Sequence, residues 1–131
     1  MPFYSTLFAA ALAVITATPL SAEACGRNQF VIKYDVGSAE ISQKDKVKLK
    51  QFAQIAKFRT QVCLFGQADS QGDPEFNDRL AKRRVELVRE YLIVHGVDRD
   101  NFAVSTQQSI TFGGILSDDN ERERSVTVSS D

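Results

Sequence analysis

The chain has 131 residues, of which 43% are hydrophobic and 25% are charged, and these proportions are ordinary for one domain that folds around a core. Its formal net charge of -1 and its lack of Trp argue against a nucleic-acid partner, which would call for a basic stripe and stacking aromatic side chains. We therefore expect a folded domain that binds no nucleic acid.

The first two dozen residues differ from the rest of the chain. Residues 1–22 contain no charged side chain, and residues 7–20 are mostly apolar. This run is short for a membrane span, which needs roughly 20 apolar residues, and two small-residue cleavage patterns follow it, Leu20-Ser21-Ala22 and Ala22-Glu23-Ala24. We expect residues 1–24 to be a secretory signal peptide and residues 25–131 to be a periplasmic domain. An uncleaved anchor and a lipid on Cys25 stay as alternatives, because residues 1–5 lack Lys and Arg and a Cys follows the leader.

The two cysteines, Cys25 and Cys63, fit an exported protein, because they can pair in an oxidising compartment. Such a bridge would stabilise the fold by about 3 to 4 kcal/mol on the chain-entropy account. Two unpaired thiols are the alternative. His95 is the only His, so we expect neither a metal site nor a cofactor.

The first half of the mature chain reads as a β-α unit. Residues 30–35 alternate apolar and polar side chains and predict a strand with Phe30, Ile32 and Tyr34 on one face. Ser42, with Asp45 three residues later, predicts the start of a helix. An apolar stripe then predicts that the helix packs against the core; its residues are Val47, Leu49, Phe52, Ala53, Ile55 and Ala56.

The second half begins with an apolar strand at 61–65, which Gly66 is expected to end or bend, and continues through a polar loop at 67–74. Apolar residues at helical spacing predict a helix over about 75–95, with Gly96 as its left-handed C-terminal cap and Val97 folding back. Strands are expected at 102–106 and 126–129. This order, β-α-β-α-β-β, predicts an α/β two-layer sandwich with the helices on one face of a mixed sheet.

One cation is out of place in the second helix. At 100° per residue, Arg84 falls in the middle of the apolar stripe, whereas Lys82, Arg83 and Arg89 are expected to point away from it. A buried guanidinium needs a partner, since an unpaired charge taken out of water costs several kcal/mol. The nearest candidate acid is Asp69, in the loop that follows the buried strand. A structural ion pair and a ligand site are both consistent with this placement.

Two segments of this region resemble the central motif of the OmpA C-terminal domain family, G-x-T-D-x-x-G followed by N-x-x-L-S-x-x-R-A. They are GQADSQG at 66–72 and NDRLAKRRV at 77–85, and they keep the family's spacing from the acid to the arginine. The first-strand exit at 34–40 and the helix end at 92–99 are also similar to the family pattern. The resemblance covers the chain from about Phe30 to its C-terminus.

The resemblance implies non-covalent binding of peptidoglycan through the free diaminopimelate end of the stem peptide, with outer-membrane proteins as further partners. By position, Asp69 would accept the ligand ammonium and Arg84 would hold the ligand carboxylate through two parallel bonds. Gly72 would allow close backbone approach, Asn77 would orient the loop, and Arg124 would keep one position of the family's C-terminal motif.

Departures from the family pattern surround this pair. Ala68 and Ala81 stand where the family has Thr and Ser, and the C-terminal motif G-R-x-x-N-R-R-V reads DNERERSV at 119–126. Glu123 could therefore compete with a ligand for Arg84. These departures make a periplasmic protein-interaction scaffold, with the fold kept and wall binding lost, the alternative function.

An enzyme is the third class, because Asp69, Asp73 and Glu75 place several carboxylates near one loop. No His or Ser partner accompanies them, and no second acid has a reason for a raised pKa. We therefore expect a protein that is not an enzyme.

Overall fold

The computed structural model describes residues 25–68, 72–108 and 124–131. Within these ranges the elements follow the predicted order of strands and helices. They are β1 (Arg27–Lys33), α1 (Gln43–Ala56), β2 (Val62–Ala68), α2 (Pro74–Val94), a short 3-10 helix (Arg99–Asn101), β3 (Phe102–Gln108) and β4 (Ser125–Ser130). None of the described helices has both the length and the apolar character to span a membrane.

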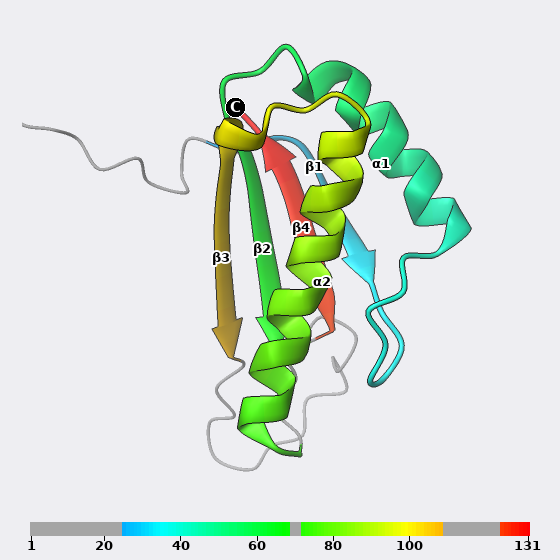
Figure 1. Ribbon diagram of the computed structural model, residues 1–131, viewed down its shortest axis with the longest axis vertical. Coiled ribbons are helices and arrows are strands. Elements are labelled where there is room, and N and C mark those ends of the chain that lie inside the picture. The colour runs from blue at the N-terminus through cyan, green and yellow to red at the C-terminus, as the bar shows by residue number, and fades with distance from the viewer. Residues whose placement is uncertain (1–24, 69–71, 109–123) are drawn as a thin grey trace, which may run out of the picture.

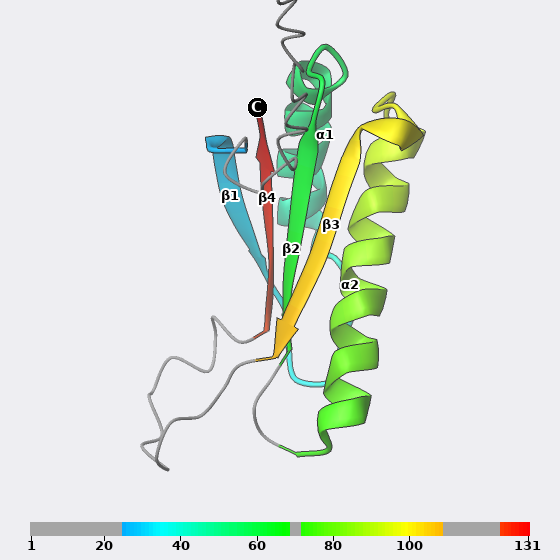
Figure 2. The same ribbon diagram turned by 90° about the vertical axis from the view of Figure 1, so that its left-hand side faces the viewer.

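The four strands form one mixed sheet in the order β1-β4-β2-β3. β2 and β3 are parallel, while β4 runs antiparallel to both of its neighbours, β1 and β2. Both helices lie over the same face of the sheet (Figures 1 and 2). The predicted two-layer α/β sandwich is confirmed.

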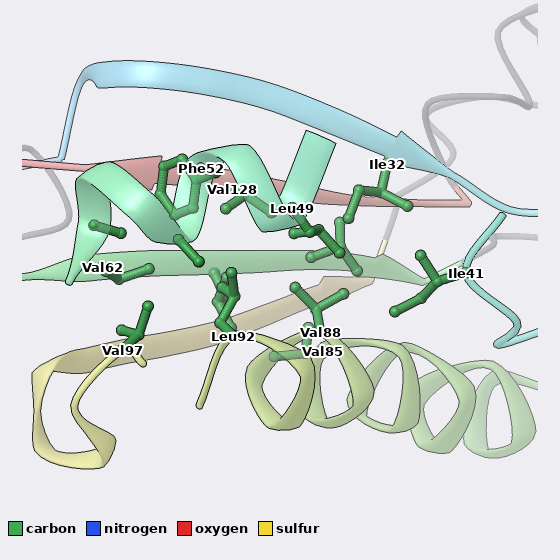
Figure 3. Packing of buried hydrophobic residues seen from close by; sticks show 14 of the residues in the cluster. Ile32, Ile41, Leu49, Phe52, Val62, Val85, Val88, Leu92, Val97 and Val128 are labelled. Atoms are coloured by element: carbon green, nitrogen blue, oxygen red, sulfur yellow. The ribbon is translucent and has the colours of Figure 1, made fainter. Parts of the chain in front are cut away.

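The core lies between the sheet and the two helices (Figure 3). Every strand that contributes to it does so through alternate residues, as the two-residue period of a strand requires. The predicted inner face of β1 is confirmed, because Ile32 and Tyr34 are buried and Phe30 packs against the cluster. The buried cluster also includes Leu49, Phe52, Val62, Leu64, Val85, Val88, Leu92, Val97, Val126 and Val128.

α1 begins where the sequence predicts. The Ser42 hydroxyl oxygen accepts a hydrogen bond from the Asp45 amide at 3.1 Å, and the same hydroxyl donates to the Asp45 carboxylate at 2.9 Å. The buried face of the helix is narrower than predicted, since Val47 and Ile55 are 57% and 45% exposed. At 100° per residue Ile55 lies at one border of the buried face and Val47 lies on the opposite side of the helix, so a helix packed on a sheet from one side leaves both in solvent.

α2 ends with the predicted glycine cap. Gly96 has φ +103°, its amide donates to the Ile93 carbonyl at 3.1 Å, and the Val97 amide donates to the Leu92 carbonyl at 3.1 Å. These two bonds define the Schellman arrangement, and the burial of Val97 completes it.

The prediction that Gly66 ends or bends the second strand is wrong. β2 continues through Gly66 to Ala68, paired with β4 on one side and β3 on the other. The glycine serves packing instead, because a Cβ at this position would lie 2.6 Å from Val85 Cγ2 and 3.2 Å from the Ala81 carbonyl oxygen. Gly66 therefore lets α2 lie close against the sheet.

A disulfide joins Cys25 to Cys63, with 6.0 Å between their Cα atoms. Cys63 alternates with the core residues Val62 and Leu64, so it lies on the sheet face opposite the helices. It pairs in register with Ser129 of β4, near the start of β2. The bridge therefore holds the segment before β1 against an interior strand.

Candidate functional site

Four segments converge at one end of the sheet, the lower end in Figure 1. These are the exits of β1 and β2, the start of α2 and the start of β4. Their proximity is set by strand pairing, since Gln67 and Lys33 both pair in register with Ser125. The Tyr34 amide also donates to the Arg124 carbonyl at 2.9 Å. In an α/β sheet such a convergence of strand ends and a helix start is where ligand sites form.

Arg84 is the charged residue at the centre of this end. Only 1% of its surface is exposed, so the helical-wheel prediction of a buried cation is confirmed. Its Nε donates to the Ser38 carbonyl at 2.7 Å, and its Nη2 donates to the Asp35 carbonyl at 3.2 Å. The guanidinium therefore ties α2 to the segment between β1 and α1 and is held there in one orientation.

The ring of Tyr34 provides a third contact. The Arg84 Cζ lies 4.9 Å from the ring centroid, within the range of a cation–π interaction. Burial raises the pKa of the Tyr34 hydroxyl above its ordinary value near 10, the positive charge of Arg84 lowers it, and Asp45 raises it. The phenol is neutral at physiological pH, as a phenol with an ordinary pKa also is.

These contacts explain how a guanidinium is accommodated in the protein interior. Two charge-assisted hydrogen bonds to backbone carbonyls and one aromatic face offset part of its desolvation cost, which an unpartnered charge would bear in full. Lys could not reproduce them, because an ammonium lacks the planar fork.

The start of α2 is built by a turn and a cap. Gly72 has φ +89°, a conformation that favours glycine, and Asp73 caps the helix by accepting from the Glu75 amide at 3.0 Å. Pro74 occupies the first helical turn. Asn77 is buried, and its Nδ2 lies 4.0 Å from the position that a Cβ on Gly72 would take. Asn77 thus faces the turn that it was predicted to orient.

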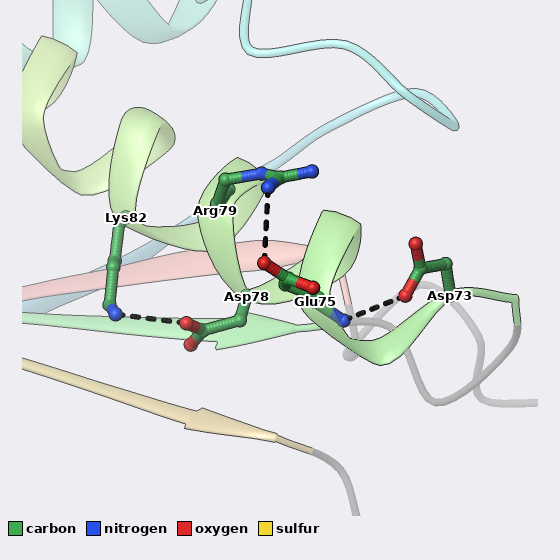
Figure 4. A network of polar contacts seen from close by, with 5 residues as sticks. All are labelled: Asp73, Glu75, Asp78, Arg79 and Lys82. Carbon is green, nitrogen blue, oxygen red and sulfur yellow. Dashed lines mark hydrogen bonds and ion pairs between the residues drawn. The ribbon is translucent and has the colours of Figure 1, made fainter.

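The acids next to this turn have structural partners (Figure 4). Glu75 pairs with Arg79 at 3.3 Å, and Asp78 pairs with Lys82 at 2.9 Å, both four residues apart on the exposed side of α2. Asp73 is the helix cap described above. In the described ranges no group of three or more His, Cys, Asp or Glu side chains is placed to hold a metal ion.

The structure brings together four of the site residues expected from the sequence at this end of the sheet: Arg84, Gly72, Asn77 and Arg124. Asp69 and Glu123 lie outside the described residues, so the predicted contact of Asp69 with Arg84 stays a prediction. The two cysteines lie toward the other end of β2 and form no part of this site.

Sequence reasoning missed three residues that hold Arg84: Tyr34, Asp35 and Ser38. Two of them act through backbone carbonyls, which leave no side-chain signal in a sequence.

The prediction for Arg89 was wrong, because its side chain is only 22% exposed and its Cζ lies 5.5 Å from the ring centroid of Phe102. The guanidinium itself lies over the ring, where its Nη2 donates to the Arg99 carbonyl at 3.4 Å and its Nη1 pairs with Glu86 at 3.7 Å.

The fold and the order of its strands and helices define an α/β domain of the OmpA-like class. Residues 33–125 match the model of the OmpA family, and the chain belongs to this family. No curated protein matches the chain by sequence.

Solved structures share the fold at low sequence identity. The peptidoglycan-associated lipoprotein of Burkholderia pseudomallei is 20% identical with a TM-score of 0.63, over 76% of this chain and 87% of that chain. The OmpA-like domain of FopA1 from Francisella tularensis is 23% identical with a TM-score of 0.61, over 77% and 70%. The C-terminal domain of Helicobacter pylori MotB is 21% identical with a TM-score of 0.61, over 78% and 85%. At these identities the likeness establishes the fold.

Proposed function

We propose that this protein binds cell-wall peptidoglycan non-covalently, through the free diaminopimelate end of the stem peptide. The observation that carries the proposal is the placement of Arg84. Its guanidinium is held in one orientation, the residue is 1% exposed, and it lies at the end of the sheet where strand exits and a helix start converge. Membership of the OmpA family supports it, as does the fold shared with a peptidoglycan-associated lipoprotein.

The ligand end carries an ammonium and a carboxylate on one carbon, so it calls for an acid and a planar cation close together. Arg84 is the cation, and its bonds to the Ser38 and Asp35 carbonyls hold the guanidinium in a fixed orientation. Asp69 is the acid that accepts the ammonium. Gly72 and Asn77 shape the turn between them.

We also propose where in the cell the protein acts and that it is a binding protein and not an enzyme. Residues 1–24 direct export and residues 25–131 act in the periplasm, near the outer membrane and its proteins. The Cys25–Cys63 disulfide supports this location, because disulfides persist in oxidising compartments. The protein acts by binding and not by catalysis, in keeping with the cap and ion-pair roles of Asp73 and Glu75.

Co-sedimentation with purified diaminopimelate-type sacculi tests the proposal. We expect the wild type to sediment with the wall, and Arg84→Lys and Asp69→Asn each to reduce the bound fraction at least tenfold. Arg83→Lys is the matched control, because it makes the same change one position away on the exposed side of α2. Thermal unfolding of each variant establishes that it is folded. Equal sedimentation of all four proteins would overturn the proposal.

A protein-interaction scaffold is the second candidate, and an apolar groove between α2 and the segment that leads into α1 is the observation that favours it. The groove has a volume of about 380 Å³ and is lined by Ile41, Leu87, Tyr91 and Val94 among others. Val94 is 79% exposed. Failure of the wild type to sediment with sacculi would favour this function.

A further inference from the structure

The hydroxyl of Tyr34 is a buried polar group without a hydrogen-bond partner among the described residues. Tyr34 is 6% exposed, so its hydroxyl has given up water on folding. A phenol in this position is costly, because an unsatisfied buried hydroxyl loses its bonds to water and gains nothing in return. A Phe would fill the same space without this cost.

Tyr91 shows the ordinary arrangement in the same protein. Its ring is also partly buried against the core, but its hydroxyl donates to the Lys46 carbonyl at 3.2 Å. The two tyrosines therefore differ in whether the fold itself satisfies the hydroxyl. Only Tyr34 lies in the candidate site.

The position of Tyr34 suggests what its hydroxyl is for. Its ring lies beneath the Arg84 guanidinium, and its backbone amide is bonded to the Arg124 carbonyl at the same end of the sheet. The two loop carbonyls fix the guanidinium relative to the ring. An anion held by Arg84 would approach the phenol edge, where a neutral O–H can donate to it.

We propose that Tyr34 is a specificity-determining residue of the site, and that its hydroxyl donates a hydrogen bond to the ligand carboxylate held by Arg84. The inference rests on the proposed function, since it adds a donor to the same site. The phenol suits this role because it is protonated at every physiological pH, and burial raises its pKa further from that range. The Arg84 guanidinium and the Tyr34 hydroxyl then both donate hydrogen bonds to the same ligand carboxylate. The site therefore discriminates against a ligand in which that carboxylate is amidated.

The test uses Tyr34→Phe in the full exported chain, with Tyr91→Phe as the matched control. The ligands are a muramyl tripeptide ending in meso-diaminopimelate and the same tripeptide with the free-end carboxyl amidated. Isothermal titration gives Kd, and thermal unfolding gives Tm. We expect Tyr34→Phe to raise Tm by a few degrees and to weaken binding of the acid tripeptide about tenfold. Tyr91→Phe should lower Tm and leave Kd unchanged.

The two ligands, measured with the wild type and with Tyr34→Phe, form a thermodynamic double-mutant cycle. We expect amidation to weaken binding to the wild type by more than tenfold, and the loss caused by Tyr34→Phe to be smaller on the amidated tripeptide, because the neutral amide oxygen is a weaker acceptor than the carboxylate. A Tyr34→Phe protein with higher Tm and unchanged Kd would overturn the inference, because the hydroxyl would then be unsatisfied in both the free and the bound protein. A lower Tm would also overturn it, since the hydroxyl would then be bonded in the free protein. Failure of the wild type to bind the acid tripeptide would instead reject the proposed function.

Discussion

Substituting Gly66 by Ala tests the close contact between α2 and the sheet. The added methyl would lie 2.6 Å from Val85 Cγ2, 3.2 Å from the Ala81 carbonyl oxygen and 3.4 Å from Thr106 Cγ2. The first distance is too short for any carbon pair. Val85 cannot turn away easily, because a β-branched side chain in a helix has one strongly preferred rotamer. The Ala81 carbonyl belongs to the helix backbone, so relief requires α2 to move away from β2.

Overpacking of this kind costs about 1–3 kcal/mol, and the backbone contact places Gly66→Ala in the upper half of that range. For a domain of about 100 residues we expect Tm to fall by roughly 10 °C. The same displacement moves the turn of α2 that carries Arg84, so ligand affinity should fall as well.

Thermal and urea unfolding of the single and double variants separate the clash from other effects. Val85→Ala alone should destabilise by about 2 kcal/mol through lost burial. Because it also removes the clashing methyl, the double variant should be more stable than the sum of the single effects by at least about 1 kcal/mol. Gly26→Ala is the control, since a Cβ there meets nothing within 4 Å. Strict additivity of Gly66→Ala and Val85→Ala would refute the packing argument.

Three further perturbations have expected outcomes. Ser42→Ala should lower the free energy of unfolding by about 1 kcal/mol in urea titration, because the cap on the first turn of α1 is lost, whereas Ser42→Asp should retain it. Replacing Cys25 and Cys63 together by Ser should cost about 4 kcal/mol on the chain-entropy account, measured in the same way, and added reductant should then have no further effect. The Thr60 hydroxyl holds the pKa of Asp131 below its usual range, so this carboxylate contributes stability above about pH 4 that is lost as pH falls through its folded pKa. Asp131→Asn should flatten the pH dependence of Tm below pH 4, and an unchanged profile would contradict the assignment.

Local signals in the sequence were enough to predict the elements and the central residue of the site. Ser42 and Gly96 mark helix ends through chemistry confined to one turn, and the structure has both caps. The burial of Arg84 followed from its place in a helical period, which neighbouring residues define without knowledge of the fold.

What the sequence did not predict depends on contacts between distant segments. Gly66 looks like a strand breaker from its own neighbours, and only the position of Val85 on a packed helix shows why a glycine is needed inside β2. The placement of β4 between β1 and β2 was likewise not predicted, because alternation within a strand says nothing about its neighbours. The carbonyls of Asp35 and Ser38 would be present whatever residues stood there.

The disulfide decides how mechanical tension would travel through this domain. β1 is an edge strand, held on one side by β4, so a pull at its N-terminal end would otherwise be borne by the β1–β4 hydrogen bonds alone. The Cys25–Cys63 bridge carries that pull directly to β2, which is bonded to a strand on each side. With a load applied at the Arg84 end, the force runs along the length of β2, and its hydrogen bonds to β3 and β4 resist together as a shear joint. Reduction of the bridge would leave the load on the single row of hydrogen bonds between β1 and β4.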